Sequence, residues 1–262
     1  MGFILPYIWF FILGTALGSF FNVLADRLPE GRDVVFERSV CSECGTVLKW
    51  YDLIPVVSFI TLGGKCRYCK TRLSPWYFVS EIIVGLLYTF SFYLYSETAD
   101  LPALFGHLVL WSLLYIVAEM DYKSGYIMDI FPIIIAVSGL IFGLLSHRKI
   151  TDILLAGAVG AAVFGLIYIL CRLILKREGL GLGDVFLIGG AGLWLSSWKE
   201  VIITCFLSAY VALVFIIIKA LKKDKIGLKT EMPLGPSICI AVFIMNVWGG
   251  EVLAFISKII LG

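Results

Sequence analysis

The sequence predicts an all-α polytopic membrane protein with about eight transmembrane helices and one small polar domain inserted after the first of them. Of its 262 residues, 60% are hydrophobic and 15% are charged, and the mean hydropathy is +0.98. Soluble domains carry about 25% charged residues. Several apolar runs are long enough to cross a hydrocarbon core about 30 Å thick. Because backbone in lipid has to satisfy its own hydrogen bonds, these runs are expected to be helices.

The predicted organisation has three parts: a first transmembrane helix at residues 1–23, a polar domain at 24–76 and a membrane-embedded domain at 77–262. Residues 1–9 contain no Lys or Arg. They therefore lack the basic start of a signal peptide, and we expect them to be retained in the first helix. The spans are expected at about residues 3–23, 77–95, 104–120, 130–145, 153–175, 185–198, 201–218 and 232–247, with a surface helix at 251–261.

Two small residues in the first span, Gly14 and Gly18, have a spacing that allows close packing against another helix. Glu81 lies near the start of the second span and is expected to be an interface residue. His107 lies inside the third span and is expected to be a hydrogen-bonded packing residue.

The polar domain contains two CxxC pairs. Cys41 and Cys44 are followed, after 21 intervening residues, by Cys66 and Cys69. Two such pairs are typical of a tetrahedral zinc site, in which each short turn supplies two thiolates. The alternative is two disulfides, which require an oxidising compartment. A closed site with four thiolates is expected to be structural and to stabilise a segment too short for a large core.

Lys and Arg are distributed unevenly between the predicted loops. With the N-terminus outside, the inner segments carry 17 of the 21 Lys and Arg residues. Cytoplasmic loops carry such an excess, so the polar domain is assigned to the cytoplasm, whose reducing conditions favour zinc over disulfides. The same topology puts Asp121, Asp129 and Asp184 at one membrane face, although no aspartate entered the count.

The stretch at 179–184, Gly-Leu-Gly-Leu-Gly-Asp, lies between two apolar runs. Glycines let another chain approach the backbone closely, and an acidic residue at the mouth of a span is a candidate for function. Asp184 can also simply cap the helix that follows it. Two carboxylates held close share a proton. The ionised member can then take a proton from water while the protonated member hydrogen-bonds a scissile carbonyl oxygen, which is a route to peptide hydrolysis.

Other catalytic patterns do not stand out in the chain. There is no HExxH motif, and the serines lack a nucleophile-elbow motif. Cys171, Cys205 and Cys239 lie in apolar runs, which indicates packing roles.

Three features occur together: Asp121 opens an acidic segment at 121–129, a Gly-x-Gly-Asp motif ends downstream at Asp184, and the double CxxC precedes both. In this combination the chain resembles the bacterial prepilin peptidases (type IV leader peptidases), a family of GxGD aspartyl proteases. The resemblance covers nearly the whole chain. Its further pieces are Gly18-Ser19-Phe20, Asn22-Val23, Arg27-Leu28-Pro29, Trp50, Asp52, Ile54-Pro55, Gly64-Lys65-Cys66-Arg67 and Pro233-Leu234-Gly235-Pro236.

The resemblance implies an endopeptidase of the cell (inner) membrane that removes the basic leader of type IV prepilins or pseudopilins, after a glycine at the cytoplasmic face. It implies Asp121 and Asp184 as the catalytic pair, with Asp129, Gly181 and Gly183 as candidates for supporting roles. Many members also methylate the new N-terminus with S-adenosylmethionine, which we expect to bind near the zinc-bearing loop, through residues that the sequence does not identify. Membrane lipid is an expected partner and nucleic acid is not.

The chain departs from the family pattern at two positions. Met128 stands where the family usually has Pro, which changes the turn beside Asp129. Ser42 stands where Pro is frequent after the first Cys, and this change does not affect zinc ligation.

Two other classes of protein are compatible with the composition. A proton-coupled transporter or channel would use membrane carboxylates, but it predicts internal repeats and acids near the bilayer midplane, whereas these acids lie at span ends. A membrane-anchored zinc-ribbon adaptor would need only structural aspartates, and it leaves the glycine-rich approach to Asp184 unexplained.

Overall fold

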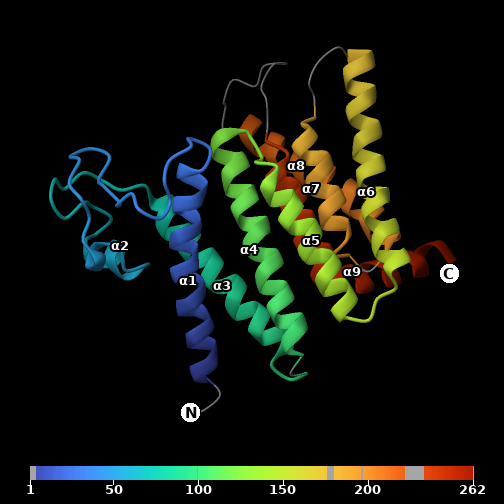
Figure 1. The fold of residues 1–262 in the computed structure, drawn as a ribbon, viewed down its shortest axis with the longest axis horizontal. Helices are drawn as coiled ribbons and strands as arrows, with labels where there is room; N and C mark the ends of the chain where they lie inside the picture. Colours follow the sequence, from blue (N-terminus) through green and yellow to red (C-terminus); the bar gives the residue numbers. More distant parts are fainter. Residues whose placement is uncertain (1–3, 99, 176–179, 196, 222–232, 262) are drawn as a thin grey trace. The chain divides into compact units, whose positions relative to one another are not determined.

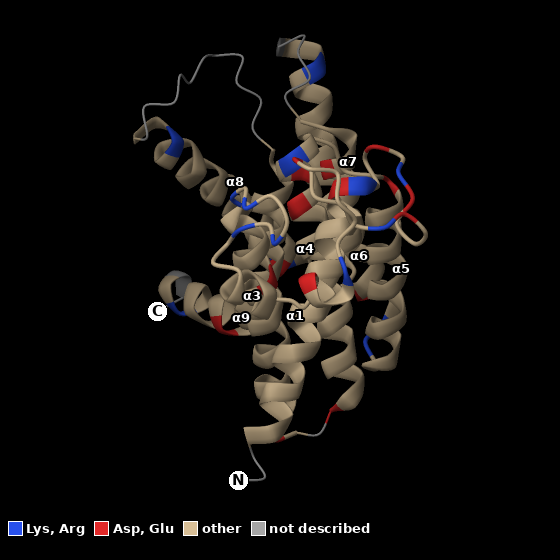
Figure 2. Ribbon diagram, turned by 90° about the vertical axis from the view of Figure 1, so that its left-hand side faces the viewer, with Lys and Arg blue, Asp and Glu red and all other residues tan. Residues whose placement is uncertain are grey.

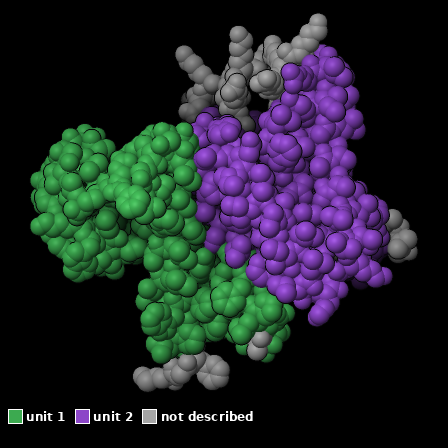
Figure 3. All heavy atoms as spheres, viewed as in Figure 1, with its two compact units in different colours: residues 1–108 green, residues 109–262 purple. Residues whose placement is uncertain are grey.

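The computed structural model consists mainly of α-helix (Figure 1) and describes residues 4–98, 100–175, 180–195, 197–221 and 233–261. The chain divides into two compact units, Met1–Leu108 and Val109–Gly262, which Figure 3 colours separately. Residues 176–179 and 222–232, which include Gly179 of the glycine-rich stretch and several lysines predicted to lie on the inner side, are outside the described residues.

In the first unit, α1 (Ile4–Arg27) packs along α3 (Pro75–Tyr95). The contact at Gly14 is very close, because a Cβ at this position would lie 2.7 Å from the carbonyl oxygen of Val84. The predicted packing role of Gly14 is therefore confirmed. Ser74 caps α3 by accepting a hydrogen bond from the N–H of Trp76 at 3.3 Å, the usual way to satisfy a free donor of the first turn.

The first helix continues one turn beyond its predicted end at residue 23. Its last polar side chains find partners there. Asn22 donates to the hydroxyl of Ser80 at 2.8 Å. Arg27 donates to the carbonyl oxygens of Asp33 at 3.0 Å and Glu37 at 2.6 Å, so its charged end also anchors the loop that follows.

That loop, residues 28–74, contains little regular structure. It has one 3₁₀ turn, η1 (Trp50–Asp52), one short helix, α2 (Val57–Thr61), and two isolated antiparallel bridges, Val40 with Val47 and Lys65 with Arg72.

The remaining helices are α4 (Leu101–Ser124), α5 (Ile130–Leu145), α6 (Ile150–Leu170) with a following π-helical turn η2 (Cys171–Leu175), α7 (Leu182–Gly192), α8 (Trp198–Leu221) and α9 (Gly235–Leu261). The last part of α4 and all of α5 to α9 belong to the second unit. There α7 packs against α5 and α6, and α8 packs against α6 and α9 (Figure 1).

The predicted class, an all-α polytopic membrane protein, is confirmed. Among the described residues, six helices are long and apolar enough to cross a membrane, namely α1, α3, α4, α6 with η2, α8 and α9. Two shorter apolar helices, α5 and α7, occupy the fourth and sixth predicted spans, so the number of about eight is approximate. Figure 2 shows long stretches of helix without charged residues, as expected of a multi-pass membrane protein.

Three boundaries differ from the prediction. Asp121 lies inside α4, which extends to Ser124, rather than after the helix. The last span and the tail form one helix, α9, instead of a span and a separate surface helix. The sixth span is shorter than predicted, because α7 ends at Gly192 and Arg148 caps it by donating to the carbonyl oxygens of residues 193–195.

A strained turn joins the loop to the first pair of helices. Val56 has a φ of 62°, which is a genuine outlier for a β-branched residue. Its N–H donates to the carboxylate of Glu81 at 2.7 Å, and Ser19 also hydrogen-bonds Glu81. Glu81 is 8% exposed, so the sequence-based view of it as an interface residue missed its main contact. The buried carboxylate holds the turn in its costly conformation.

Glu81→Ala is therefore expected to loosen the loop. Loss of a hydrogen bond to a charged group costs about 1.5–3 kcal/mol, which raises local opening, and with it tryptic cleavage within residues 28–74, by about tenfold or more. In a Val56→Gly background the effect should be smaller, because glycine adopts this φ without strain.

The exposed Glu97, which lies outside this loop, provides the control variant Glu97→Ala. Cleavage rates of detergent-solubilised protein would be compared by mass spectrometry. An equal effect of Glu81→Ala in both backgrounds would argue against the strained turn as the element that Glu81 holds.

Candidate functional site

Asp121 and Asp184 come together in the second unit. Asp121 lies in the last turn of α4 and Asp184 in the first turn of α7. Their exposed fractions are 5% and 8%. The two carboxylates are close enough for their charges to interact. Two like charges in such a poorly solvated place cannot both ionise readily.

A backbone N–H group binds each carboxylate. Gly181 donates to Oδ2 of Asp184 at 3.1 Å, and Gly235 donates to Oδ2 of Asp121 at 2.8 Å. The first bond is half of a capping box at the start of α7. Asp184 is the third residue of the helix rather than the residue before it, so it contributes to the cap in a different way from the one considered from the sequence. A cap does not require a second buried carboxylate nearby. The presence of Asp121 therefore indicates that Asp184 does more than cap its helix.

Gly183 allows the start of α7 to approach the segment that follows α4. A Cβ at Gly183 would lie 3.2 Å from Cβ of Ile127, closer than side chains normally pack. Gly181 is the N-cap residue of α7. The two glycines of the motif therefore both help to position Asp184. Gly181 binds the carboxylate through its amide, and Gly183 allows the helix start to pack closely.

The lysine nearest to the pair along α4 is bound elsewhere. Lys123 lies two residues after Asp121, and its Nζ lies 2.7 Å from Oε1 of Glu119, which is itself buried. Lys123 and Glu119, four residues apart on α4, therefore form an ion pair. In the part of the chain that the structure describes, the amides of Gly181 and Gly235 are the hydrogen-bond donors to Asp184 and Asp121.

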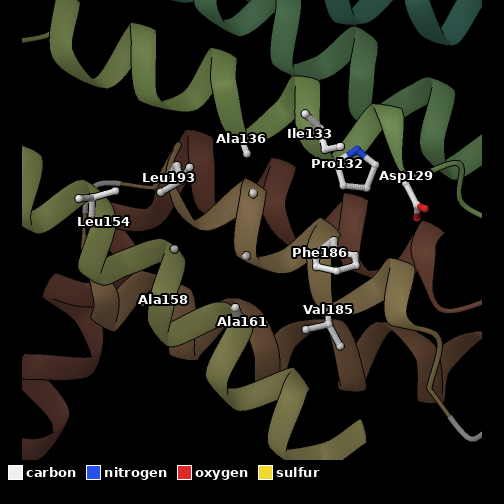
Figure 4. A pocket seen from close by; sticks show the side chains of 13 residues that line it. Asp129, Pro132, Ile133, Ala136, Leu154, Ala158, Ala161, Val185, Phe186 and Leu193 are labelled. Carbon is white, nitrogen blue, oxygen red and sulfur yellow. The ribbon is translucent and has the colours of Figure 1, made fainter.

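Asp129 occupies a different setting from the buried pair. It is the N-cap residue of α5 and is exposed. It lies at one end of an apolar groove of about 580 Å³ between α5, α6 and α7 (Figure 4). Small residues of α6 and α7, such as Ala158, Ala161 and Gly189, form part of its lining, and Phe186 flanks it.

The four cysteines of the CxxC pairs form one cluster in the first unit. The Sγ atoms of Cys41, Cys44, Cys66 and Cys69 all lie within 4.8 Å of one another, and those of Cys41 and Cys69 are 3.8 Å apart. Four thiolates about 2.3 Å from one Zn²⁺ ion would lie about 3.8 Å from one another. All four thiols are free rather than paired in disulfides. The donor set and its spacing therefore fit a zinc ion.

The two CxxC turns share one backbone design. In each, the N–H of the first cysteine donates across a short hairpin, from Cys41 to the carbonyl of Thr46 and from Cys66 to that of Thr71. The residue after the second cysteine has a positive φ in both, 66° at Gly45 and 62° at Lys70. Each turn thus directs both sulfurs to the same side, as ligation requires.

Hydrogen bonds around the cluster favour the thiolate form of one ligand and fix the second turn. The side-chain and backbone groups of Thr71 lower the pKa of Cys69 to about 6. Asp52 accepts hydrogen bonds from Nε of Arg67 at 2.6 Å and from the hydroxyl of Tyr68 at 3.0 Å. Burial raises the pKa of Asp52, but the hydrogen bonds from Arg67, Lys49 and Tyr68 outweigh it and lower that pKa overall.

Two site features were missed by the sequence analysis. The bond from Gly235 joins residues 114 positions apart, and its only signal was the Pro-Leu-Gly-Pro segment at 233–236. The contact between Glu81 and Val56 had no signal in the sequence. His107, by contrast, was predicted as a packing residue, and its hydrogen bonds to the hydroxyl of Tyr95 and the carbonyl of Ala103 confirm this.

Comparison with known families gives two matches that together cover most of the chain. Residues 12–95 match the bacterial peptidase A24 N-terminal domain, and residues 108–217 match the type IV leader peptidase family. The second match begins at the boundary between the two units.

Several curated proteins are similar to the chain over most of its length. A prepilin leader peptidase/N-methyltransferase of Klebsiella pneumoniae is 35% identical over 208 residues, which cover 74% of this chain and 88% of that protein. Proteins of the same name from Pseudomonas putida and Aeromonas salmonicida are 31% and 27% identical, and each alignment covers more than 90% of both chains. Comparison with solved structures gave no significant match.

Proposed function

The chain belongs to the type IV leader peptidase family, and from this premise we propose that it is a membrane aspartyl endopeptidase that cleaves the basic leader from type IV prepilins or pseudopilins. Cleavage follows a glycine at the cytoplasmic face of the inner membrane. The enzyme then methylates the new N-terminus. Family membership does not favour the transporter or the zinc-ribbon adaptor.

The buried pair of Asp121 and Asp184 is the observation that carries this proposal. The pair shares one proton and titrates as a unit. The ionised carboxylate accepts a proton from a water molecule as the water oxygen attacks the scissile carbonyl carbon. The protonated carboxylate donates its proton to the carbonyl oxygen, which becomes a hydroxyl group of the tetrahedral intermediate.

Collapse of the tetrahedral intermediate needs two further proton transfers. One carboxylate gives its proton to the leaving nitrogen as the C–N bond breaks, and the other accepts the hydroxyl proton as the carbonyl re-forms. The leader leaves with a carboxyl terminus, and the mature segment leaves with a free amine. Oδ2 of each aspartate binds a glycine amide, so Oδ1 of each is the atom assigned to proton transfer.

The chemistry of the substrate agrees with the surroundings of the pair. A prepilin has a basic leader followed by an apolar helix, and that helix can enter the bilayer and leave the scissile bond near the interface. The apolar groove between α5, α6 and α7 suits such a helix, and the exposed carboxylate of Asp129 at its end suits a basic residue of the leader. We assign supporting roles to Asp129, Gly181 and Gly183.

Two cofactors are part of the proposal. The fit of the four-cysteine cluster supports a structural zinc ion held by Cys41, Cys44, Cys66 and Cys69. The names of the relatives support S-adenosylmethionine, which supplies the methyl group for the amine that cleavage releases. We place its binding site near the zinc-bearing loop and assign no side chain to it.

Asp121→Asn and Asp184→Asn are each expected to lower kcat for prepilin cleavage by about 10²–10⁴-fold, because general acid–base catalysis contributes about this much. Asn keeps the size of the side chain and removes the titratable group. Purified enzyme in detergent or lipid would be given a prepilin with its leader. Mass spectrometry of the product would detect cleavage and, in the wild type, the added methyl group.

Two further variants separate the roles of the other acids. Asp129→Asn is expected to raise KM and to retain most of kcat. Asp152→Asn, at an exposed site in the first turn of α6, serves as the control and is expected to match the wild type. Full activity of a folded Asp121→Asn or Asp184→Asn enzyme would contradict the assigned pair.

The purified protein is expected to contain about one zinc ion per chain, since four thiolates complete one tetrahedral site. Serine in place of any of the four cysteines should reduce the zinc content and lower the thermal stability of the loop, while Cys171→Ser, in η2, should keep the metal. Elemental analysis of protein prepared without chelators measures this. Zinc retained at wild-type levels in the four Ser variants would refute the site.

A further inference from the structure

The start of α9 lies against the catalytic pair through its backbone. Gly235 is the first residue of this helix, and its N–H donates a buried hydrogen bond to Oδ2 of Asp121 at 2.8 Å. N–H groups of a first helical turn have no partner within the helix. The carboxylate of Asp121 provides one, and the helix dipole favours negative charge at this end.

Glycine is the residue that this contact requires. A Cβ at position 235 would lie 2.6 Å from Oδ2, 2.9 Å from Cγ and 3.0 Å from Cβ of Asp121. The aspartate or the start of α9 would therefore have to move. The next residue, Pro236, has no N–H to offer, so the amide of Gly235 is the donor that the first two residues of α9 supply.

A second observation places the same helix near both acids. Cys239 lies one turn after Gly235 and is 4% exposed. Its thiol is within electrostatic range of both Asp121 and Asp184. The first turns of α9 therefore face the pair as a whole, and a small displacement of this helix would change how the two carboxylates meet.

We propose that Gly235 is a positioning residue for the hydrolysis: its amide holds Oδ2 of Asp121 and so directs Oδ1 toward the proton shared with Asp184. The role rests on the proposed function of the pair. Gly235 does not touch the reacting atoms, and it acts by fixing the orientation of the carboxylate. Because misplacement of a catalytic group by about 1 Å can cost about 10²-fold in rate, a single added methyl group at this position has a large effect.

The test compares Gly235→Ala with Gly250→Ala in the full-length enzyme. Gly250 lies in the same helix, and a Cβ there would meet nothing within 4 Å. Gly235→Ala is expected to lower kcat by about 10²-fold, to leave KM within about twofold and to shift the pH profile of kcat. Gly250→Ala is expected to match the wild type in all three measurements.

A thermal-stability cycle tests the contact without using activity. Gly235→Ala should lower the Tm of the wild type and should lower it much less in an Asp121→Ala background, where Oδ2 and Cγ are absent. Hydrogen exchange adds a measurement that needs no variant of Gly235: the amide of residue 235 should exchange slowly in the wild type and in Asp121→Asn, and faster in Asp121→Ala.

The outcomes separate this proposal from the proposed function. If Asp121→Asn is inactive but Gly235→Ala keeps the wild-type kcat and pH profile, the positioning role is overturned and the catalytic pair stands. Equal losses of Tm in both backgrounds, or unchanged exchange in Asp121→Ala, overturn the contact itself. If Asp121→Asn is fully active, the pair is wrong, and the positioning role falls with it even where the cycle shows coupling.

Discussion

Burial of two carboxylates within electrostatic range of each other is the constraint on which the second unit depends. Ionised groups lose much solvation energy when they leave water, and a second charge of the same sign adds repulsion. Both costs apply to Asp121 and Asp184, because their exposed fractions are only 5% and 8%. Hydrogen bonds to a carboxylate offset part of that loss, and glycine amides at the starts of α7 and α9 donate one such bond to each aspartate. The starts of α7 and α9 thus supply backbone N–H groups to the two buried carboxylates.

The first unit is subject to a different constraint: a polar loop has to be ordered next to apolar helices. Residues 28–74 contain only short elements, so a conventional core cannot hold them. The structure fixes this loop at three places: Arg27 binds its first carbonyls, Glu81 binds the strained turn at Val56, and the cysteine cluster gathers its two hairpins. Arg27 and Glu81 are buried polar groups that gain these partners only when the loop is folded, and two of the four cysteines, Cys41 and Cys66, are buried as well.

The parts of the structure that could be predicted from the sequence are those encoded over short distances. Apolar runs located the helices, since lipid permits little else, and most of their boundaries to within about a turn; the ends of α7 and α9 are the exceptions. The CxxC spacing located the cysteine cluster. The charge count placed Asp121, Asp129 and Asp184 at one membrane face, and the family resemblance then singled out Asp121 and Asp184 as a pair. The bonds from Gly235 to Asp121 and from Val56 to Glu81 depend on how distant helices pack. No periodicity or local motif carries that information, and the same holds for the cap that Arg148 provides to α7.

Within the described residues, amides are the donors that bind Asp121 and Asp184, and uncharged donors agree with the proposed mechanism. A lysine or arginine bound to either aspartate would hold it ionised and would stabilise a fully deprotonated pair, which cannot donate a proton to a carbonyl oxygen. Amides fix the geometry equally well and do not add a full charge. Glycine at 181 and 235 then has two purposes: its backbone can reach the carboxylate, and its N–H can hold an oxygen while the shared proton remains free to move. A membrane-face protease built on two acids therefore needs close backbone approach as much as it needs the acids.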